Sequence, residues 1–457
     1  MTPDSKRTPR AARARSWRPD GGSLALGVLI VLSASFATTT LVDAVSGLPA
    51  DTAEPTRPLA FLIGAPLFGV WDSLSLLTAS QHYAVVLTLV AAYIVIRLIR
   101  LVRRVPLRAP GAGRGLVARA TGETARALAA LGVLLAFYAA GLLVPRPMVG
   151  IELADPELMS VDFHSHTMYS HDGWGLFTAR RNRAWHEGGG FNVGYVTDHY
   201  TWRGVDAATV DNPERVGERT ALLSGAEIRI HQRPTNILGD RWRYLFALDS
   251  DSIYMEPDSL RARGDVDGKP PTLLYTMPGQ LQYVVPFSDT DRSGVIGIEI
   301  NDGSPRGLEQ VRRDRREILA LADSADLAVV AAANLHGWGR TVAAWSVMRI
   351  PGWQEMTPEE VGDAIEAELH AERRASVDVV ERRMPYHGES GVLLALTLPR
   401  LGWEHFRMLS LGERLSWLLW LGLVGGLRAR RPRSTPVEAS LGTGSGLQAA
   451  VGRGSGR

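Results

Sequence analysis

The sequence predicts an α/β domain, either a barrel or a layered sheet, that apolar α-helices attach to a membrane on both of its sides. The 457-residue chain combines 45% hydrophobic with 21% charged residues, a mixture that indicates apolar segments beside a polar domain. Arginines gather next to the apolar runs, in residues 6–18, 97–126 and 428–433, as they do at the cytoplasmic ends of membrane helices. From residue 160 onward, short β-prone runs alternate with helical patterns, which is typical of α/β domains.

The composition also excludes several classes of site. The chain has no cysteine, so it has no disulfides, no thiolate metal ligands and no cysteine nucleophile. This fits an extracytoplasmic location. The arginine clusters could instead form a nucleic-acid-binding stripe, but no aromatic residues are interleaved with them. We therefore expect a membrane partner and no nucleic acid.

The membrane region is expected at residues 22–147, with spans at about 23–42, 83–102 and 127–144. Such runs are long enough to cross a hydrocarbon layer of ~30 Å. The first could instead be a cleaved signal peptide. A fourth, weaker span is expected at 409–428. Segment 59–79 is interrupted by Pro66 and Asp72, and a crossing there would place the arginine-rich loop outside, so we expect it to be interfacial or re-entrant.

The same charge rule fixes the expected orientation. The basic N-terminus (1–21) and the tail 434–457 have compositions typical of disorder and are placed in the cytoplasm. Residues 150–400 form the α/β domain on the extracytoplasmic side. The chain is thus expected to be an integral protein of a bacterial inner (plasma) membrane.

Within the domain, continuous apolar runs predict parallel strands that are covered on both faces. The candidate strands are Ser160–His164, Asn192–Thr197, Ala221–Ile230, Leu273–Thr276, Gly294–Ile300 and Leu327–Ala333. Helices are expected at 176–188, 306–324 and 357–371. The last begins with Thr357-Pro358-Glu359-Glu360, which provides a capping hydroxyl, a proline in the first turn and a capping-box glutamate.

Metal-ligand residue types fall at the ends of several of these strands. His164 and His166 end the first strand, Asp198 and His199 follow the second, Glu227 lies on the third, and His336 follows the last. In α/β barrels, several strands contribute their carboxyl ends to one site. His164 and His166 share one face of an extended segment and together could bind a divalent ion; alone, they could equally be two surface histidines.

Three motifs in order carry a resemblance to a known family. D-F-H-S-H-T-x-x-S-x-D-G begins at Asp162, V-T-D-H ends at His199, and S-G-A-E-I contains Glu227. The series, over about residues 158–345, resembles the PHP (polymerase and histidinol phosphatase) domain family. The resemblance implies a distorted (β/α)7 barrel with up to three Zn, Mn or Fe ions. It implies one ligand set of His164, His166 and Glu227 and another of Asp172, His199 and His336.

The chain departs from the family pattern at three positions, where Asn236, Met277 and Asn334 replace expected ligands. Methionine is a soft, weak ligand beside oxygen and imidazole donors, and an asparagine carbonyl carries no charge. We therefore expect one or two divalent ions.

Other polar residues are assigned secondary roles. Asp198 is expected to orient an imidazole or to act on a proton, and Arg340 is the first choice to clamp a phosphate. The remaining candidates are Arg180, Arg181, Arg203 and Arg229 as phosphate contacts, His171 and His231 as substitute ligands, His186 and His387 as surface residues, and Trp338, Trp345 and Trp353 as core residues or membrane anchors.

The resemblance implies a metal-dependent phosphoesterase whose substrate is a small-molecule phosphate or a lipid- or glycan-linked phosphate. The alternative is a catalytically degenerate PHP-like barrel that binds a ligand or an ion as a sensor or assembly subunit. A transporter is disfavoured because the expected spans carry almost no ionisable residues.

Overall fold

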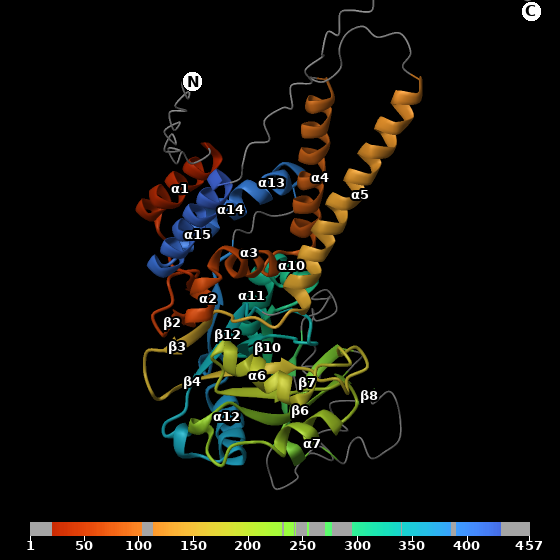
Figure 1. Ribbon diagram of the computed structural model, residues 1–457. Helices are drawn as coiled ribbons and strands as arrows, with labels where there is room; N and C mark the ends of the chain where they lie inside the picture. Colours follow the sequence, from red (N-terminus) through yellow and green to blue (C-terminus); the bar gives the residue numbers. More distant parts are fainter. Residues whose placement is uncertain are drawn as a thin grey trace, which may run out of the picture.

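The computed structural model describes residues 21–102, 113–230, 233–241, 243, 254–255, 270–276, 295–339, 341–384 and 390–430. The α/β domain lies at one end of the molecule, and helices α1, α4, α5, α13, α14 and α15 lie at the other, with α2 and α3 between them (Figure 1). The N-terminal tail 1–20 and the C-terminal tail 431–457, where the sequence predicts disorder, lie outside the described residues.

The domain is built on one mixed sheet with the order β1-β13-β12-β4-β5-β6-β7-β9-β10-β11, and β8 pairs with β6. Its strands are β1 (Leu41–Asp43), β4 (Leu158–Ser165), β5 (Val193–Val196), β6 (Ala221–Ile230), β7 (Arg233–Leu238), β8 (Tyr254–Met255), β9 (Thr272–Tyr275), β10 (Val295–Asp302), β11 (Ala328–Ala332), β12 (Ala344–Arg349) and β13 (Asp378–Arg382). A separate two-stranded sheet pairs β2 (Ala53–Thr56) with β3 (Gly150–Leu153).

The central strands curl until the last returns to the first. Strands β4, β5 and β6 are parallel, β7 runs antiparallel to β6 and β9, and β9, β10 and β11 are parallel again. Ser165 forms a parallel bridge with Leu335, and the backbone N–H of His166 donates to the carbonyl of Leu335 at 2.9 Å. The sheet is therefore a curled mixed α/β sheet, consistent with the distorted seven-stranded barrel that the resemblance implies.

Asp162 helps to join the two edges of this curl. Its Oδ1 accepts from the backbone N–H of Ala333 at 2.9 Å, and its Oδ2 lies 2.9 Å from Nε2 of His186. His186 is fully buried. The expectation that His186 is a surface residue was therefore wrong, because its ring satisfies a buried carboxylate.

The helices of the domain are α6 (Ala179–Gly189), α7 (Arg203–Thr209), α10 (Pro305–Arg313), α11 (Arg315–Ala325) and α12 (Pro358–Glu372). The capping box at Thr357 and Glu360 is present as predicted. The helix expected at 306–324 is divided into α10 and α11 at Asp314, whose φ of −96° and ψ of 6° are not helical.

The other helices are α1 (Gly21–Ser33), α2 (Leu59–Ile63), α3 (Ala65–Ser75), α4 (Ala79–Val102), α5 (Gly113–Leu143), α13 (Gly391–Ala395), α14 (Thr397–Met408) and α15 (Leu411–Arg430). Within the described residues, two stretches are long and apolar enough to cross a membrane, Ala79–Arg100 and Ala120–Leu143. Only 6% of each apolar window is buried within the molecule, unlike a helix of a soluble core. Segment 59–79 forms α2 and α3, which are 5 and 11 residues long.

The expected helix over 23–42 was wrong in its second half. Helix α1 ends at Ser33, and Leu41–Asp43 form β1, which pairs with β13 at the edge of the sheet. Three consecutive threonines, Thr38–Thr40, precede the strand; β-branched side chains favour extended backbone over helix. At 13 residues, α1 is shorter than a full span requires.

A buried ion-pair network fixes α3 to the domain. Oδ1 of Asp72 lies 2.9 Å from Nη2 of Arg146 and accepts from the hydroxyl of Thr341 at 2.9 Å, while Oδ2 accepts from Nη1 of Arg382 at 2.9 Å. The side chain of Asp72 is 1% exposed. The apolar segment 59–79 thus carries an aspartate because Arg146, just after α5, and Arg382 of the domain need a buried counter-charge.

Candidate metal centre

The first group of ligand-type side chains lies at the end of β4. Nε2 of His164 is 3.0 Å from Nε2 of His166 and 3.0 Å from Oε2 of Glu227 on β6, and Nε2 of His166 is 3.4 Å from the same oxygen. His164 and His166 are fully buried. His164 and His166 come together because β4 stays extended through Ser165, so side chains two residues apart share a face.

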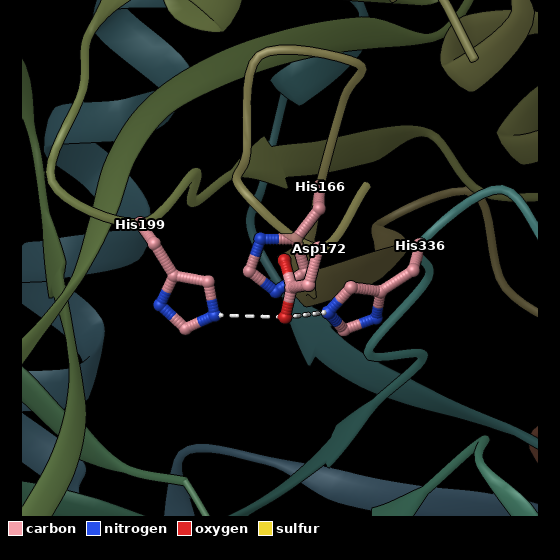
Figure 2. A group of neighbouring side chains, drawn as sticks. All are labelled: His166, Asp172, His199 and His336. Carbon is pink, nitrogen blue, oxygen red and sulfur yellow. Dashed lines mark hydrogen bonds and ion pairs between the residues drawn. The ribbon is translucent and has the colours of Figure 1, made fainter. Parts of the chain in front are cut away.

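A second group shares His166 and adds residues from three loops. Oδ2 of Asp172 lies 3.3 Å from Nε2 of His199 and 3.0 Å from Nε2 of His336 (Figure 2). The His166 ring lies 4.9 Å from that of His199 and 4.2 Å from that of His336, centre to centre. The structure therefore brings all six residues expected as ligands into two adjoining groups, which have His166 in common.

The donor set fits a divalent ion. Two ligands at 2.0–2.1 Å from a tetrahedral ion are themselves roughly 3.4 Å apart, close to the 3.0–3.4 Å between the donor atoms of His164, His166 and Glu227. Nε2 of His164 and Nε2 of His166 face each other and the same carboxylate. Nδ1 of His166 is buried and has no hydrogen-bond partner within the described residues. So many converging nitrogen and oxygen atoms are best satisfied by a cation.

The charges of the groups agree with this. Burial lowers the pKa of His166 to about 3, which keeps its ring neutral and leaves one ring nitrogen with a free lone pair. Burial alone would raise the pKa of Asp172, but hydrogen bonds with His199, His336 and Ser170 outweigh it and hold that pKa well below its usual value. Asp172 is thus an anion, as a metal ligand must be.

Glu299 on β10 is a member of the site that sequence reasoning did not assign. Its Oε1 is 2.7 Å from Nδ1 of His164, which orients the ring so that Nε2 faces the other ligands. Burial disfavours protonation of His164, but Glu299 and Glu227 outweigh it and raise its pKa. The available signal was a carboxylate within a continuous apolar strand, since such a group needs a buried partner.

Asp198 lies beneath the second group. Its two oxygens accept from the backbone N–H and the hydroxyl of Thr167, both at 2.6 Å, and Oδ1 is 3.9 Å from Nδ1 of His166. Burial raises its pKa, although the bonds from Thr167 oppose the shift. In this position it holds the segment after His166; its expected action on a proton stays a prediction.

The remaining candidates have different outcomes. Asn236 is buried and its Nδ2 donates to the carbonyl of Phe163 at 3.2 Å, and Nδ2 of Asn334 donates to Asp302 at 3.1 Å. The His171 ring lies 4.7 Å from that of His199, beside the second group. Its role as a substitute metal ligand stays a prediction. Arg340, Met277, His231 and His387 lie outside the described residues.

Two of the arginine candidates lie over aromatic rings: Arg203 is 4.6 Å above the ring of Tyr169, and Arg181 is 5.8 Å above the ring of Trp174. Trp338 is 47% exposed and stacks on Trp174. Trp345 is fully buried, and Trp353 is 7% exposed. Trp345 and Trp353 are thus core residues.

A cavity of about 500 Å³ adjoins the second group. Asp172 and His336 form part of its wall, and residues of α3, α4 and α5 form another part. The six ligand-type side chains of the two groups, called the ligand cluster below, are therefore accessible at Asp172 and His336 from the side of the apolar helices.

No family model matches the sequence, and no curated protein does. Among solved structures, PsfC from Pseudomonas syringae is similar at a TM-score of 0.34 and 16% identity, covering 54% of this chain and 98% of that one. A two-domain protein from Bacteroides vulgatus, titled as containing a predicted PHP-like metal-dependent phosphoesterase, gives 0.30 and 15% over 49% and 65% of the two chains. An amidohydrolase from Chromobacterium violaceum, with bound sulfate and no metal, gives 0.26 and 17% over 49% and 97%. These TM-scores are too low to identify the fold or the function of this chain.

Proposed function

We propose that this chain is a membrane-anchored, metal-dependent phosphoesterase with a PHP-type site. The observation that carries the proposal is the convergence of six ligand-type side chains from separate strand ends into two adjoining groups. A structural role for buried histidines and carboxylates would need pairing in twos, as between Asp162 and His186. The cluster instead has several donor atoms that face one another and one common space.

The residues of the chain divide the work between them. His164, His166 and Glu227 would hold one ion, and Asp172, His199 and His336, with His166, would hold a second. Divalent ions bound there would lower the pKa of water and neutralise the charge of a phosphate. Glu299 fixes the ring of His164, and Asp198 fixes the segment that carries His166 through Thr167.

The membrane anchor belongs to the same proposal. The apolar surface of α4 and α5 is exposed, and Arg97 and Arg100 lie near the end of α4 that is remote from the domain (Figure 1). With the positive-inside bias, this supports insertion of the hairpin into a bacterial plasma membrane and an extracytoplasmic site.

The test uses the full chain purified in detergent and loaded with Mn²⁺ or Zn²⁺. Bound metal and hydrolysis of a phosphomonoester are compared between the wild type and His199→Ala, with Glu317→Ala as an exposed control. We expect metal in the wild type, and a fall in turnover of at least about 100-fold in His199→Ala. Metal-free wild type, or equal turnover in wild type and His199→Ala, would refute the enzyme.

The rival is a degenerate barrel that binds an ion without turnover. Asn236 and Asn334 favour it, because neutral amides stand where the family has ligands. The same experiment separates the two functions: the rival retains bound metal in the wild type but has no hydrolysis above that of His199→Ala.

A further inference from the structure

The cavity beside the ligand cluster joins two chemically different surfaces. On one side lie the metal-ligand candidates Asp172 and His336. On the other lie Leu74 of α3, His82 of α4, and Ala139 and Leu142 of α5. A molecule that occupies the whole cavity therefore contacts the ligand cluster and the apolar helices at once.

The joint between these surfaces is held by hydrogen bonds. The backbone N–H of Gly339, three residues after His336, donates to the carbonyl of Leu142 near the end of α5 at 3.2 Å. Arg146, just after α5, donates to the hydroxyl of Thr341 at 2.9 Å. The segment that carries His336 is thus bonded at two places to the end of α5 and the residues after it, so the cavity has a fixed shape.

Three polar atoms of the cavity-lining residues have no partner. Nε1 of Trp185, Oη of Tyr138 and Oδ1 of Asn334 are each buried and make no hydrogen bond within the described residues. Trp185 is 3% exposed. Leaving a buried donor or acceptor unsatisfied costs about 1–3 kcal/mol. The ligand-type side chains of Asp172 and His336 on one side of the cavity and the apolar helices on the other indicate a ligand with a polar head.

Helices α4 and α5, which line the cavity, extend beyond it and carry exposed apolar side chains there. On α4, Leu87 is 67% exposed and Ile94 is 49% exposed; on α5, Val133 is 71% and Leu135 is 60% exposed. The cavity lies at the domain ends of α4 and α5, where they leave the membrane in the proposed orientation. That is the level of lipid headgroups, and aromatic side chains such as the exposed Trp338 favour it.

We infer that the substrate is a membrane lipid whose headgroup ends in a phosphate monoester. This rests on the proposed function. The phosphate reaches the ligand cluster through the cavity, and the lipid chains stay along α4 and α5. In the reaction, a water oxygen forms a bond to phosphorus and the bond between phosphorus and the lipid oxygen breaks. One water proton passes to that oxygen, which gives a lipid alcohol and inorganic phosphate.

The experiment compares two substrates with the same head: dioleoyl phosphatidic acid in mixed micelles and glycerol 3-phosphate in water. The full chain with Mn²⁺ should have the higher kcat/KM on the lipid. Ala139→Trp, which fills the cavity, should lower the ratio of lipid to soluble kcat/KM about tenfold or more. Val133→Trp is the matched control, because Val133 is on the same helix but does not line the cavity; it should keep the ratio of the wild type.

A wild type that prefers glycerol 3-phosphate, or an Ala139→Trp variant with an unchanged ratio, would overturn the inference while the phosphoesterase stands. If neither substrate is hydrolysed, the proposed function fails, and a binding measurement then decides whether the cavity takes this lipid. Immobilised wild type should then retain tritiated phosphatidic acid against excess phosphatidylcholine, and Ala139→Trp should not. Equal retention by the two chains would reject the lipid site.

Discussion

At the scale of single residues, the carboxylate of Glu299 determines which nitrogen of His164 is offered to a metal. Its Oε1 lies 2.7 Å from Nδ1, so in a metal-bound site Nδ1 would keep its proton and Nε2 would offer its lone pair to the metal. Groups that orient a metal-binding histidine affect metal affinity strongly. We expect Glu299→Gln to weaken metal binding about 10–100-fold, measured by competition with a chelator.

The control for this change is Glu317→Gln, an exposed carboxylate on α11, which should bind metal as the wild type does. Glu299→Gln should keep the fold, because its amide oxygen can still accept from Nδ1 of His164. An unchanged metal affinity in Glu299→Gln would show that the ring of His164 is held by its packing alone.

The predictability of the site also differs residue by residue. Five of the ligand candidates could be found from the sequence, because a polar side chain on or just after an apolar strand indicates a functional role. They are His164, His166, His199, Glu227 and His336. Glu299 and His186 could not be assigned, because their partners, His164 and Asp162, lie on strands 135 and 24 residues away. Periodicity gives the face of a strand but not the partner opposite it.

At the scale of elements, the attachment of α3 to the domain depends on Asp72. Replacing it leaves Arg146 and Arg382 buried without their counter-charge, and breaking a buried pair in this way costs roughly 3–5 kcal/mol. We expect Asp72→Ala to lower the thermal unfolding midpoint of the detergent-solubilised chain markedly. The loss should spread to the site, because Thr341 and Arg146 join this network to the segment after His336.

The comparison variant is Glu157→Ala, which removes an exposed partner of Arg349, both 52% exposed. An exposed ion pair contributes about 0–1 kcal/mol, so the midpoint should barely move. If Asp72→Ala and Glu157→Ala have equal midpoints, the network is not what holds α3 in place.

A buried histidine on α14 gives a dependence on pH to the stability of the helical layer, which consists of α1–α5 and α13–α15. Burial is the main cause that lowers the pKa of His405 from 6.5 to about 4, with Asp72 and Arg382 acting in opposite directions; its Nδ1 is 2.9 Å from the hydroxyl of Ser73 on α3. Between these pKa values the unfolded chain binds a proton that the folded chain does not. Stability is therefore complete above pH 6.5 and falls, by about 3 kcal/mol, as the pH decreases to about 4.

The variant that isolates this effect is His405→Asn, which keeps a polar group near Ser73 but does not titrate. The difference in unfolding midpoint between wild type and His405→Asn should favour the wild type above pH 6.5 and shrink toward pH 4. A difference that is constant over this range would exclude His405 as the titrating group.

Elements were predictable where one face or both faces of a segment carry a regular pattern. Strands β4, β5, β6, β9, β10 and β11 and helices α6 and α12 lie close to their expected ranges, because buried parallel strands are continuous apolar runs. Strand β1 could not be predicted, because its apolar residues continue the apolar run of α1 and they form a strand only by pairing with β13. Strand β7 is short and polar at its start, and its antiparallel pairing with β6 depends on contacts that no local pattern records.

At the scale of the whole molecule, the helical layer and the α/β domain meet at the ligand cluster. The cavity, the loop after His336 and the network of Asp72 all lie at this junction. The sequence predicted both parts, because apolar length and strand alternation are local patterns. It could not predict that Asp172 and His336 face the helices, since this depends on the hydrogen bond between the segment after β11 and the end of α5.

The proposed orientation is testable because the natural chain contains no cysteine, so one introduced thiol is the sole target of a maleimide. Val210 is 82% exposed and follows α7, which lies at the end of the domain remote from the helical layer (Figure 1). With the arginine-rich segment 97–126 in the cytoplasm, Val210→Cys should react with a membrane-impermeant maleimide in intact spheroplasts. Ala109→Cys, in the segment between α4 and α5, should react only after the membrane is opened. The reverse pattern would place the ligand cluster in the cytoplasm, whereas labelling of both thiols in sealed spheroplasts would contradict an inserted helical layer. Labelling of Val210→Cys alone would support a site that meets its lipid substrate from the outer leaflet.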